Sequence, residues 1–419
     1  MKRLQIMFAA LIIPAGHPDI EIKNFNLVES RLMNRSMEIQ AQNAQLFQEE
    51  RIGLLHKILA KIWSTQGSIY EVQAEVAALD TLKQDFRTEG VTTIATPDSY
   101  RLETSNVTYE AESKTLHGTE NVRLAPLTGT QMHGAQNFKL QGKGLYVDLS
   151  QDLFRIEKSV QAEQKINAGI SLKITSKSFE FDSIAEQAHF IDDVSVIHPQ
   201  YKLKGKILDL IFAHATAATE APKTKNKAKA SATRATDDAV PQEAKTLKEM
   251  YLKASSDPSS NAKVQASIGT TTFNSKGFRI LFASDGTPSG SEATGAAEAT
   301  LDNGIILRAE KLYSFVEDDI QKIRMEENVE IITPDRKAHC QQALFTPSTG
   351  DFMLEKIASL SDADQTIQGE RIYFSTQNNT LRVEKASGKI NRQKVQLSTT
   401  PDATPAEPEN PATKQAPKP

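Results

Sequence analysis

A pattern of about thirty residues recurs along most of the chain and constrains the fold more than any other feature. In each copy, two apolar residues alternate with polar ones up to a small residue, and after two spacers a second alternating apolar pair follows. The small residues of the copies are Ala41, Ala74, Thr104, Gly142, Ser176, Gly205, Ser275, Ala309, Cys340 and Gly369. Loose matches of this kind also occur in other β-rich chains, but the even spacing favours one supersecondary unit stacked on copies of itself.

The unit is predicted to be a β-hairpin. Period-two alternation indicates strands with one buried face. The alternation slips after the small residue, so both apolar pairs face one core only if a bulge or corner lies there. A small side chain suits such a bend, because a large one would crowd the neighbouring strand. Polar turns such as Asp182–Glu186 lead into return strands such as Ala188–Ile197.

Composition narrows the class of protein. Hydrophobic residues make up 39% of the chain and aromatic residues 6%, which fits thin, two-layer β architecture better than a thick core. The net charge of −4 argues against nucleic acid as a partner. The single cysteine, Cys340, allows no disulfide within the chain, and its place in the repeat favours a buried structural residue over a reactive thiol.

Residues 1–17 have the character of an export segment. Lys2 and Arg3 precede the apolar run Leu4–Ile13, as in a secretory signal peptide. The run is shorter than the roughly 20 residues that span a bilayer. A short membrane anchor truncated by a misplaced start is one alternative, and an incidental apolar start is the other. A signal peptide and an anchor both place the rest of the chain outside the cytoplasm.

Two blocks of repeats flank a stretch of different composition. We expect a larger β domain at 18–213, a disordered linker at 214–262, a smaller β domain at 263–392 and a disordered, proline-rich tail at 393–419. The linker is rich in Ala, Thr, Lys and Ser, and it cannot bury enough apolar surface to offset the entropy of ordering. Within the linker, Thr246–Ala254 allows a short helix.

One segment fits two periodicities. Leu55, Leu59 and Ile62 have helical spacing. Ile58, Ala60 and Ile62 alternate as in a strand. We predict a strand, because the repeat places the return strand of the first hairpin there.

No motif for catalysis or for metal or cofactor binding interrupts the repeat. The chain has no HExxH, CxxC, GxSxG or P-loop pattern. Its eight histidines are scattered, with no second histidine at ligand spacing, so we expect no metal site. The acidic cluster at 317–319 falls in a predicted turn, where solvated carboxylates are usual. We therefore expect neither catalytic residues nor a cofactor, and a protein that is not an enzyme.

The strand at 201–206 has one basic face. Its apolar residues alternate with Lys202, Lys204 and Lys206. The simpler interpretation is a solvent face whose lysines protect a sheet edge. The functional alternative is a basic rim that receives an anionic lipid headgroup.

These features resemble the lipopolysaccharide-export bridge proteins LptC and LptA, which share the OstA-like domain. The first block is similar to LptC in IEIKNFNL at 20–27 and MEIQAQNA at 37–44. The second block is similar to LptA in IILRAE at 305–310, ENVEI at 327–331 and QGERIYF at 368–374. The chain departs from the family in two ways, because its apolar N-terminal run is shorter than the LptC anchor and because both domain types are fused.

The resemblance implies two β-jellyroll domains, each with two sheets that splay into a V around an apolar groove. Such domains perform no chemistry and carry lipopolysaccharide from the inner-membrane ABC transporter complex toward the outer membrane. The implied location is the periplasm, in association with the inner membrane. The strand alternation then predicts these groove residues: Ile39, Val72, Leu102, Leu140, Ile174, Leu203, Phe273, Leu307 and Ile367.

The resemblance also implies partners. Other OstA-like domains, or the outer-membrane lipopolysaccharide translocon, would join by strand addition. The predicted terminal strands for such contacts are Asp19–Val28 and Leu381–Ile390.

Two other classes of protein are compatible with the repeat. A structural β-solenoid scaffold or surface protein would close its core, whereas a bridge would leave apolar residues that do not fill the interior. A carbohydrate-active β-helix enzyme would need acidic residues stacked at equivalent positions of the repeat, and the sequence has no such column.

Overall fold

The computed structural model describes residues 17–31, 34–97, 100–126, 138–167, 170–214, 245–257, 259–283, 287–362, 365–378 and 380–389. These residues form 26 β-strands and no helix, which confirms the predicted all-β, jellyroll-like fold class. The predicted export segment 1–17 lies, apart from His17, outside the described residues, as does the predicted tail 393–419.

The strands follow one another with short turns. The first half of the chain contains β1(Ile20–Arg31), β2(Asn34–Phe47), β3(Ile52–Trp63), β4(Ile69–Asp80), β5(Phe86–Ala95), β6(Tyr100–Ser105), β7(Thr108–Glu110), β8(Thr115–Pro126), β9(Phe138–Asp148), β10(Leu153–Asn167), β11(Ile170–Ser176), β12(Ser178–Asp182), β13(Gln187–Ile197) and β14(Tyr201–His214). The second half contains β15(Lys245–Lys253), β16(Val264–Ile268), β17(Thr271–Ser275), β18(Gly277–Phe282), β19(Pro288–Thr300), β20(Ile306–Glu317), β21(Ile320–Ile332), β22(Lys337–Thr346), β23(Asp351–Ser361), β24(Thr366–Ser375), β25(Leu381–Glu384) and β26(Ser387–Lys389). The ambiguous segment at 55–62 lies within β3, so the strand prediction is confirmed.

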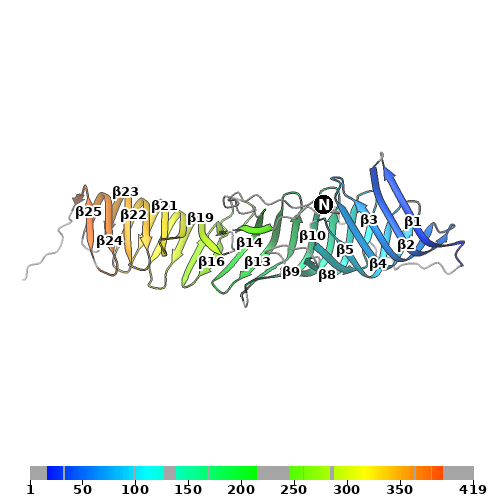
Figure 1. The fold of residues 1–419 in the computed structure, drawn as a ribbon. Coiled ribbons are helices and arrows are strands. Elements are labelled where there is room, and N and C mark those ends of the chain that lie inside the picture. The colour runs from blue at the N-terminus through cyan, green and yellow to red at the C-terminus, as the bar shows by residue number, and fades with distance from the viewer. Residues whose placement is uncertain are drawn as a thin grey trace, which may run out of the picture.

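All the printed strand pairs are antiparallel, and most long strands pair with the strands next to them in sequence. Several long strands are interrupted, so that β10 pairs with both β11 and β12. Figure 1 shows the result as an elongated stack of strands, from the blue β1 at one end to the orange β25 at the other.

Part of the predicted linker belongs to the sheet. The predicted short helix at 246–254 is wrong, because this segment forms β15, which pairs with β14 on one side and β18 on the other. Met250 and Leu252 alternate with Tyr251 and are buried, and tertiary pairing overrides the weak helical tendency of the segment. Strand β14 also pairs with β16, so hydrogen bonds continue from the first block of repeats into the second. Residues 215–244 of the predicted linker lie outside the described residues.

Each long strand bends near its middle. On the return strands the register shifts next to positive-φ residues such as Ser159, Asp193 and Glu327. The small residue of the repeat lies across from this bulge, as Gly205 does in its pairing with Val194. The predicted bend is confirmed, with the extra residue on the strand that opposes the small one.

Close approach explains why the residue at the bend is small. A Cβ atom added at Gly142 would lie 2.5 Å from Cγ2 of Ile156 and 2.9 Å from the carbonyl oxygen of Lys158. At Gly205 an added Cβ would meet the side chain of Leu252 at 2.8 Å. Both glycines therefore leave room for the neighbouring strand at the inside of the bend.

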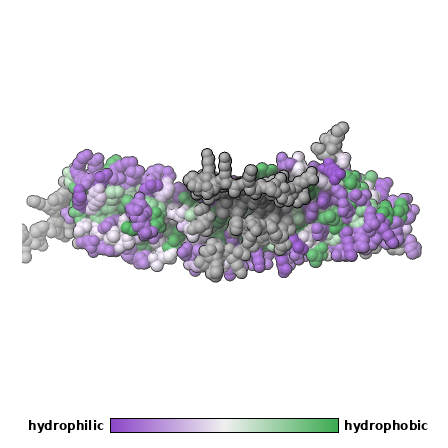
Figure 2. Space-filling view, in the orientation of Figure 1, coloured by the Kyte–Doolittle hydropathy of each residue, from purple (hydrophilic) through white to green (hydrophobic). Residues whose placement is uncertain are grey.

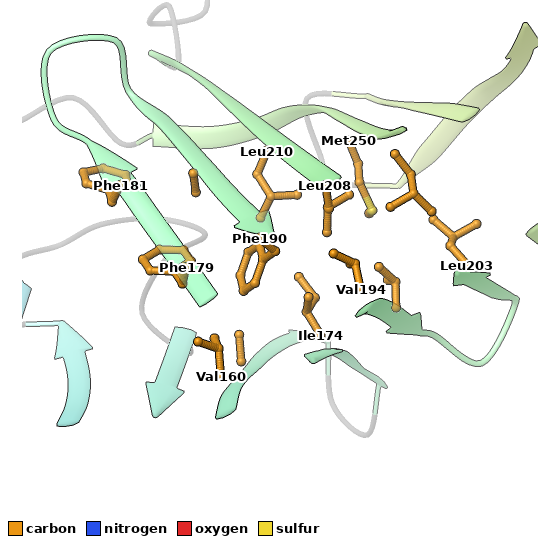
Figure 3. Packing of buried hydrophobic residues seen from close by; sticks show 14 of the residues in the cluster. Val160, Ile174, Phe179, Phe181, Phe190, Val194, Leu203, Leu208, Leu210 and Met250 are labelled. Carbon is orange, nitrogen blue, oxygen red and sulfur yellow. The ribbon is translucent and has the colours of Figure 1, made fainter. Parts of the chain in front are cut away.

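The bends fold the sheet over on itself, so that every long strand contributes to two facing walls. We call wall A the half that carries the turns at 64–68 and 198–200, and wall B the half that carries the turns at 81–85 and 149–152. The apolar side chains of both walls point inward and interlock. Figure 3 shows this packing, with Phe179, Phe190 and Leu208 of wall B near Ile174 and Val194 of wall A. The outer faces carry the polar residues of the alternation, and hydrophilic side chains predominate on the face drawn in Figure 2.

The two end strands leave the core partly open. Within the described residues, β1 pairs only with β2, and β25 and β26 pair only with β24. The inward residues Ile22, Phe25 and Leu27 of β1 are only partly buried. At the other end, Leu381 of β25 is 41% exposed. Both predicted terminal strands are therefore sheet edges beside incompletely covered apolar side chains.

Candidate functional site: an apolar cleft between the two walls

A cleft opens between the rims of the two walls near the middle of the molecule. Its volume of about 30 Å³ is enough for about two water molecules, so the cleft is narrow and would have to widen to admit a larger ligand. Its lining residues are Tyr100, Leu124, Phe138 and Gln164 from wall A and Phe154, Phe179, Phe181, Ala188, Phe212 and Leu247 from wall B. We call this set the inter-wall cleft. None of these described lining residues carries a formal charge, so the cleft favours apolar ligands.

Aromatic rings line the floor of the inter-wall cleft, and one pair of rings meets across its opening. The ring of Phe154 lies 5.3 Å from that of Phe181 and 5.9 Å from that of Phe179, measured between centroids. Across the opening, Tyr100 of wall A meets Phe181 of wall B edge to face, with centroids 6.0 Å apart. Tyr100, Phe138 and Phe212 are only partly buried, so the cleft is accessible from outside.

A polar contact joins the same two rims closer to the N-terminal end. The carboxylate of Asp152, in the turn after β9 on wall B, accepts hydrogen bonds from the hydroxyls of Ser64, Ser68 and Tyr70 on wall A at 3.1–3.2 Å. The backbone N–H of Thr65 also donates to the carbonyl of Leu149 at 3.1 Å. We call this contact the Asp152 clasp. It links residues more than eighty positions apart and is buried, since Asp152 is only 2% exposed.

The predicted groove residues all lie on inward faces, but most are covered. Their exposed fractions are Ile39 0%, Val72 0%, Leu102 0%, Leu140 2%, Ile174 2%, Leu203 1%, Phe273 5% and Leu307 0%. Ile367, near the C-terminal edge, is half-buried and pairs with the buried Leu360. The orientation predicted from alternation is confirmed for these residues, whereas their contact with lipid stays a prediction. None of them lines the inter-wall cleft, although Leu102 and Leu140 lie two residues deeper than Tyr100 and Phe138 on the same strands.

The three predicted headgroup lysines lie on the opposite side of the sheet from the cleft. Lys202 and Lys204 are exposed on the outer face of wall A. Lys206 lies at the bend, with its Nζ atom 4.0 Å from Oδ1 of Asp192. The structure therefore separates Lys206 from the other two lysines, and any role as a headgroup site stays a prediction.

The outer face of wall B, behind the cleft, is held by paired charges. Nδ1 of His189 lies 2.8 Å from Oδ1 of Asp209, and Nζ of Lys253 lies 2.6 Å from the other oxygen of that carboxylate. The hydrogen bond to Asp209 raises the pKa of His189, although burial acts in the opposite direction. Burial raises the pKa of Asp209, but the hydrogen bonds from His189 and Lys253 outweigh it and leave that pKa lowered.

Sequence reasoning missed the aromatic lining of the cleft. Phe138, Phe179 and Phe181 belong to recognised copies of the repeat, but alternation alone does not distinguish them from other inward residues. A local signal was present, because six of the 17 phenylalanines lie between residues 138 and 212. The meeting of Tyr100 with Phe181 is a contact between opposite ends of distant strands, which no local pattern encodes.

The described residues contain no group of three or more histidine, cysteine, aspartate or glutamate side chains able to hold a metal ion. None of these residues belongs to a helix long and apolar enough to cross a membrane. Cys340 is buried, and burial raises the pKa of its thiol to about 12, so the structural interpretation of this cysteine is supported.

No protein-family model matches the chain, and no curated protein matches it by sequence.

Proposed function

We propose that this protein is a non-enzymatic, lipid-carrying bridge protein of the periplasm, which holds acyl chains of lipopolysaccharide between its two walls. The observation that carries the proposal is the inter-wall cleft, an uncharged, aromatic-lined opening in a protein whose other described inward residues are largely covered. Tyr100 and Phe181 meet at the opening ring edge to ring face, the kind of apolar contact that an acyl chain can also make.

The physical need for such a cleft is large. Each methylene moved from water into an apolar site gains about 0.8 kcal/mol, so a chain of a dozen methylenes gains roughly 10 kcal/mol. Exposing the chain to water costs the same free energy, and this cost keeps such a lipid from crossing an aqueous space unaided. Apolar surfaces between two walls lower the cost without demanding the directional contacts that would hold the lipid in one place.

The open sheet edges support the second half of the proposal, which is assembly into a longer path. In the part of the chain that the structure describes, β1 at one end and β25 with β26 at the other pair on one side only and lie next to partly covered apolar residues. Strand addition at either edge would continue both the sheet and its apolar interior. The partners proposed from the resemblance are the inner-membrane ABC transporter complex on one side and further OstA-like domains or the outer-membrane translocon on the other.

A structural scaffold remains the second candidate, and one observation favours it. Most of the predicted groove residues are 0–5% exposed, so the walls enclose a packed core over much of the molecule. A bridge of this shape must therefore admit lipid first at the cleft and open further along the walls only as lipid enters.

Site-specific photo-crosslinking in lipopolysaccharide-producing cells tests the proposal. A probe replacing Phe181, which faces the cleft, should capture lipopolysaccharide. The matched control is the adjacent residue Glu180, which faces outward on the same strand and pairs with Arg155. Probes at Leu102, Leu140 and Ile174 report whether lipid reaches deeper. Equal capture from Phe181 and Glu180, or none from Phe181, would reject the bridge in favour of the scaffold.

A further inference from the structure

The outer face of wall A carries a set of cations in register. Glu163 of β10 pairs with Lys139 of β9 on one side and with Lys173 of β11 on the other. Lys173 pairs with Ile197, which in turn pairs with Lys202 of β14. Lys139, Lys173 and Lys202 therefore form one row, with about 10 Å between successive lysines at the usual strand spacing.

A neighbouring row on the same face adds two further cations. In this row Arg123 of β8 stands between Glu103 of β6 and Gln141 of β9, and Lys204 of β14 lies further along it. We call the five residues Arg123, Lys139, Lys173, Lys202 and Lys204 the basic face. Two of them, Lys202 and Lys204, come from the strand whose lysine pattern is evident in the sequence.

The basic face is not neutralised by the protein itself. Among the described residues, none of its five cations lies within 4.0 Å of a carboxylate, and Glu163 is the one acid in the row of Lys139, Lys173 and Lys202. Elsewhere on the outer face of wall A a cation is neutralised, since Arg308 forms ion pairs with Glu298 at 2.8 Å and with Glu330 at 2.9 Å. A local excess of positive charge on a chain of net charge −4 indicates a partner that supplies the negative charge.

The surface beneath these cations is hollowed. A concavity with an empty volume of about 1,020 Å³ is lined by residues 123–125 of β8, 139–141 of β9, 161–163 of β10 and 173–175 of β11. Within it, Nε2 of Gln141 donates to Oε1 of Gln161 at 3.1 Å, so amide groups stand beside the cations. A concave surface with cations and amides suits a compact polar ligand with hydroxyls better than it suits a flat bilayer.

The concavity and the inter-wall cleft lie back to back on the same strands. Leu124 borders both of them, and Phe138 in the cleft is followed directly by Lys139 in the concavity. A molecule that places acyl chains in the cleft would therefore need to bend only over the rim of wall A to bring its polar head to the basic face.

We propose that the basic face binds the phosphorylated saccharide head of the acylated lipid whose chains enter the inter-wall cleft. This inference rests on the proposed function and adds to it the chemical class of the head group and the surface that recognises it. Phosphate groups pair with the lysine and arginine side chains, and the glutamine amides hydrogen-bond to sugar hydroxyls.

Binding measurements with the full-length protein test the inference. Three probes are titrated: bis-phosphorylated lipid A, the same lipid without its phosphates, and a phosphorylated oligosaccharide without acyl chains. The double variant Lys139→Gln/Lys173→Gln is compared with Lys83→Gln/Lys337→Gln, which makes the same charge change at exposed positions off the basic face.

The inference expects the first variant to weaken binding of phosphorylated lipid A about tenfold, as two lost charge contacts would. Binding of the dephosphorylated lipid should stay unchanged, and the weak binding of the free oligosaccharide should disappear. The control variant should alter none of the three affinities by more than about twofold. High salt should reduce the difference between the two lipids.

Each contrary result has its own meaning. If the wild-type protein binds neither lipid, the proposed function and this inference both fail. If it binds both lipids equally well and the basic-face variant changes nothing, lipid carriage stands and the head-group site is refuted. In a separate titration, vesicles of anionic phospholipid replace the three probes. If the Lys139→Gln/Lys173→Gln variant weakens binding to these vesicles as strongly as it weakens binding of lipid A, the face is a membrane contact and the saccharide site is overturned.

Discussion

Among the described residues, two contacts between the rims of the walls differ in kind. At the Asp152 clasp, one buried carboxylate accepts three hydrogen bonds from the opposite wall. At the inter-wall cleft, the rings of Tyr100 and Phe181 touch edge to face beside empty space. The clasp cannot open without leaving polar groups unpaired, which costs free energy. An acyl chain can replace the ring contact with similar apolar contacts of its own. We therefore call the Asp152 clasp the fixed closure and the contact of Tyr100 with Phe181 the exchangeable closure.

The clasp should be the more costly of the two contacts to remove. Asp152→Ala removes the acceptor of three hydroxyls, those of the buried Ser64 and Tyr70 and of the half-buried Ser68, so we expect the free energy of unfolding to fall by about 3 kcal/mol, measured by urea denaturation. The matched control is Asp182→Ala. It removes an exposed carboxylate that caps its own turn by accepting from the N–H groups of Ile184 and Ala185, and it should cost about 1 kcal/mol. Equal losses in the two variants would show that the clasp has no special role in closure.

The bend beneath the cleft should tolerate almost no added volume. In Gly142→Ala the new Cβ meets a backbone carbonyl and an isoleucine methyl, so we expect a loss of about 2 kcal/mol by the same measurement. Gly118→Ala is the control, because its added Cβ has no neighbour closer than 3.7 Å and neither glycine has a positive φ. A neutral Gly142→Ala variant would mean that the walls pivot at the bend, and the contrast between a fixed and an exchangeable closure would weaken.

The ring contact at the cleft should matter less for stability than for lipid. Phe181→Ala removes a ring that borders empty space, so we expect a loss of about 1.5 kcal/mol in unfolding free energy. Phe190→Ala, which deletes a ring that is 0% exposed, should cost at least about twice as much. Calorimetry with lipid A should show weaker binding for the first variant only. If both variants lose lipid affinity in proportion to their lost stability, the cleft is not the lipid site.

The smallest expected effect is on the pH dependence of the unfolding free energy, and it comes from the pair of His189 and Asp209 on the outer face of wall B. The pKa of His189 is raised in the folded protein, so its pairing with Asp209 stabilises fully below the ordinary histidine pKa of about 6.5. That contribution is lost as the pH rises through the folded-state pKa. We expect the unfolding free energy to decline over this window and the decline to be reduced in His189→Gln. An unchanged pH profile in the variant would assign the dependence to other groups.

Local patterns in the sequence were sufficient to predict the β-hairpin that is the repeating unit of this fold. The repeat placed β3 as a strand despite its helical spacing, and alternation gave the inward orientation of residues such as Leu102 and Ile174. The small residues marked the bends, because Gly142 and Gly205 have no room for a side chain. Strand β15 was mistaken for linker, since only Met250 and Leu252 alternate clearly in a polar segment whose pairing partners lie on both sides.

The candidate site depended on distant contacts and was not predictable in the same way. Asp152 and Ser64 lie at opposite ends of the strands, and they meet only because the bent sheet folds over by a particular amount. The same holds for Tyr100 and Phe181 at the cleft. Bend angle and twist accumulate over many strands, so a repeat pattern that fixes each hairpin does not fix which rims touch.

Distances across the two contacts, measured by pulsed electron spin resonance with and without lipid A, test the central claim most directly. One pair of spin labels replaces Arg101 and Ile184 beside the cleft, and a second pair replaces Gln66 and Gln151 beside the clasp, both with Cys340→Ala. We predict that lipid A lengthens the distance across the cleft and leaves the distance across the clasp unchanged. If lipid A binds and the distance across the cleft does not change, or if both distances lengthen together, the account of one exchangeable and one fixed closure is contradicted.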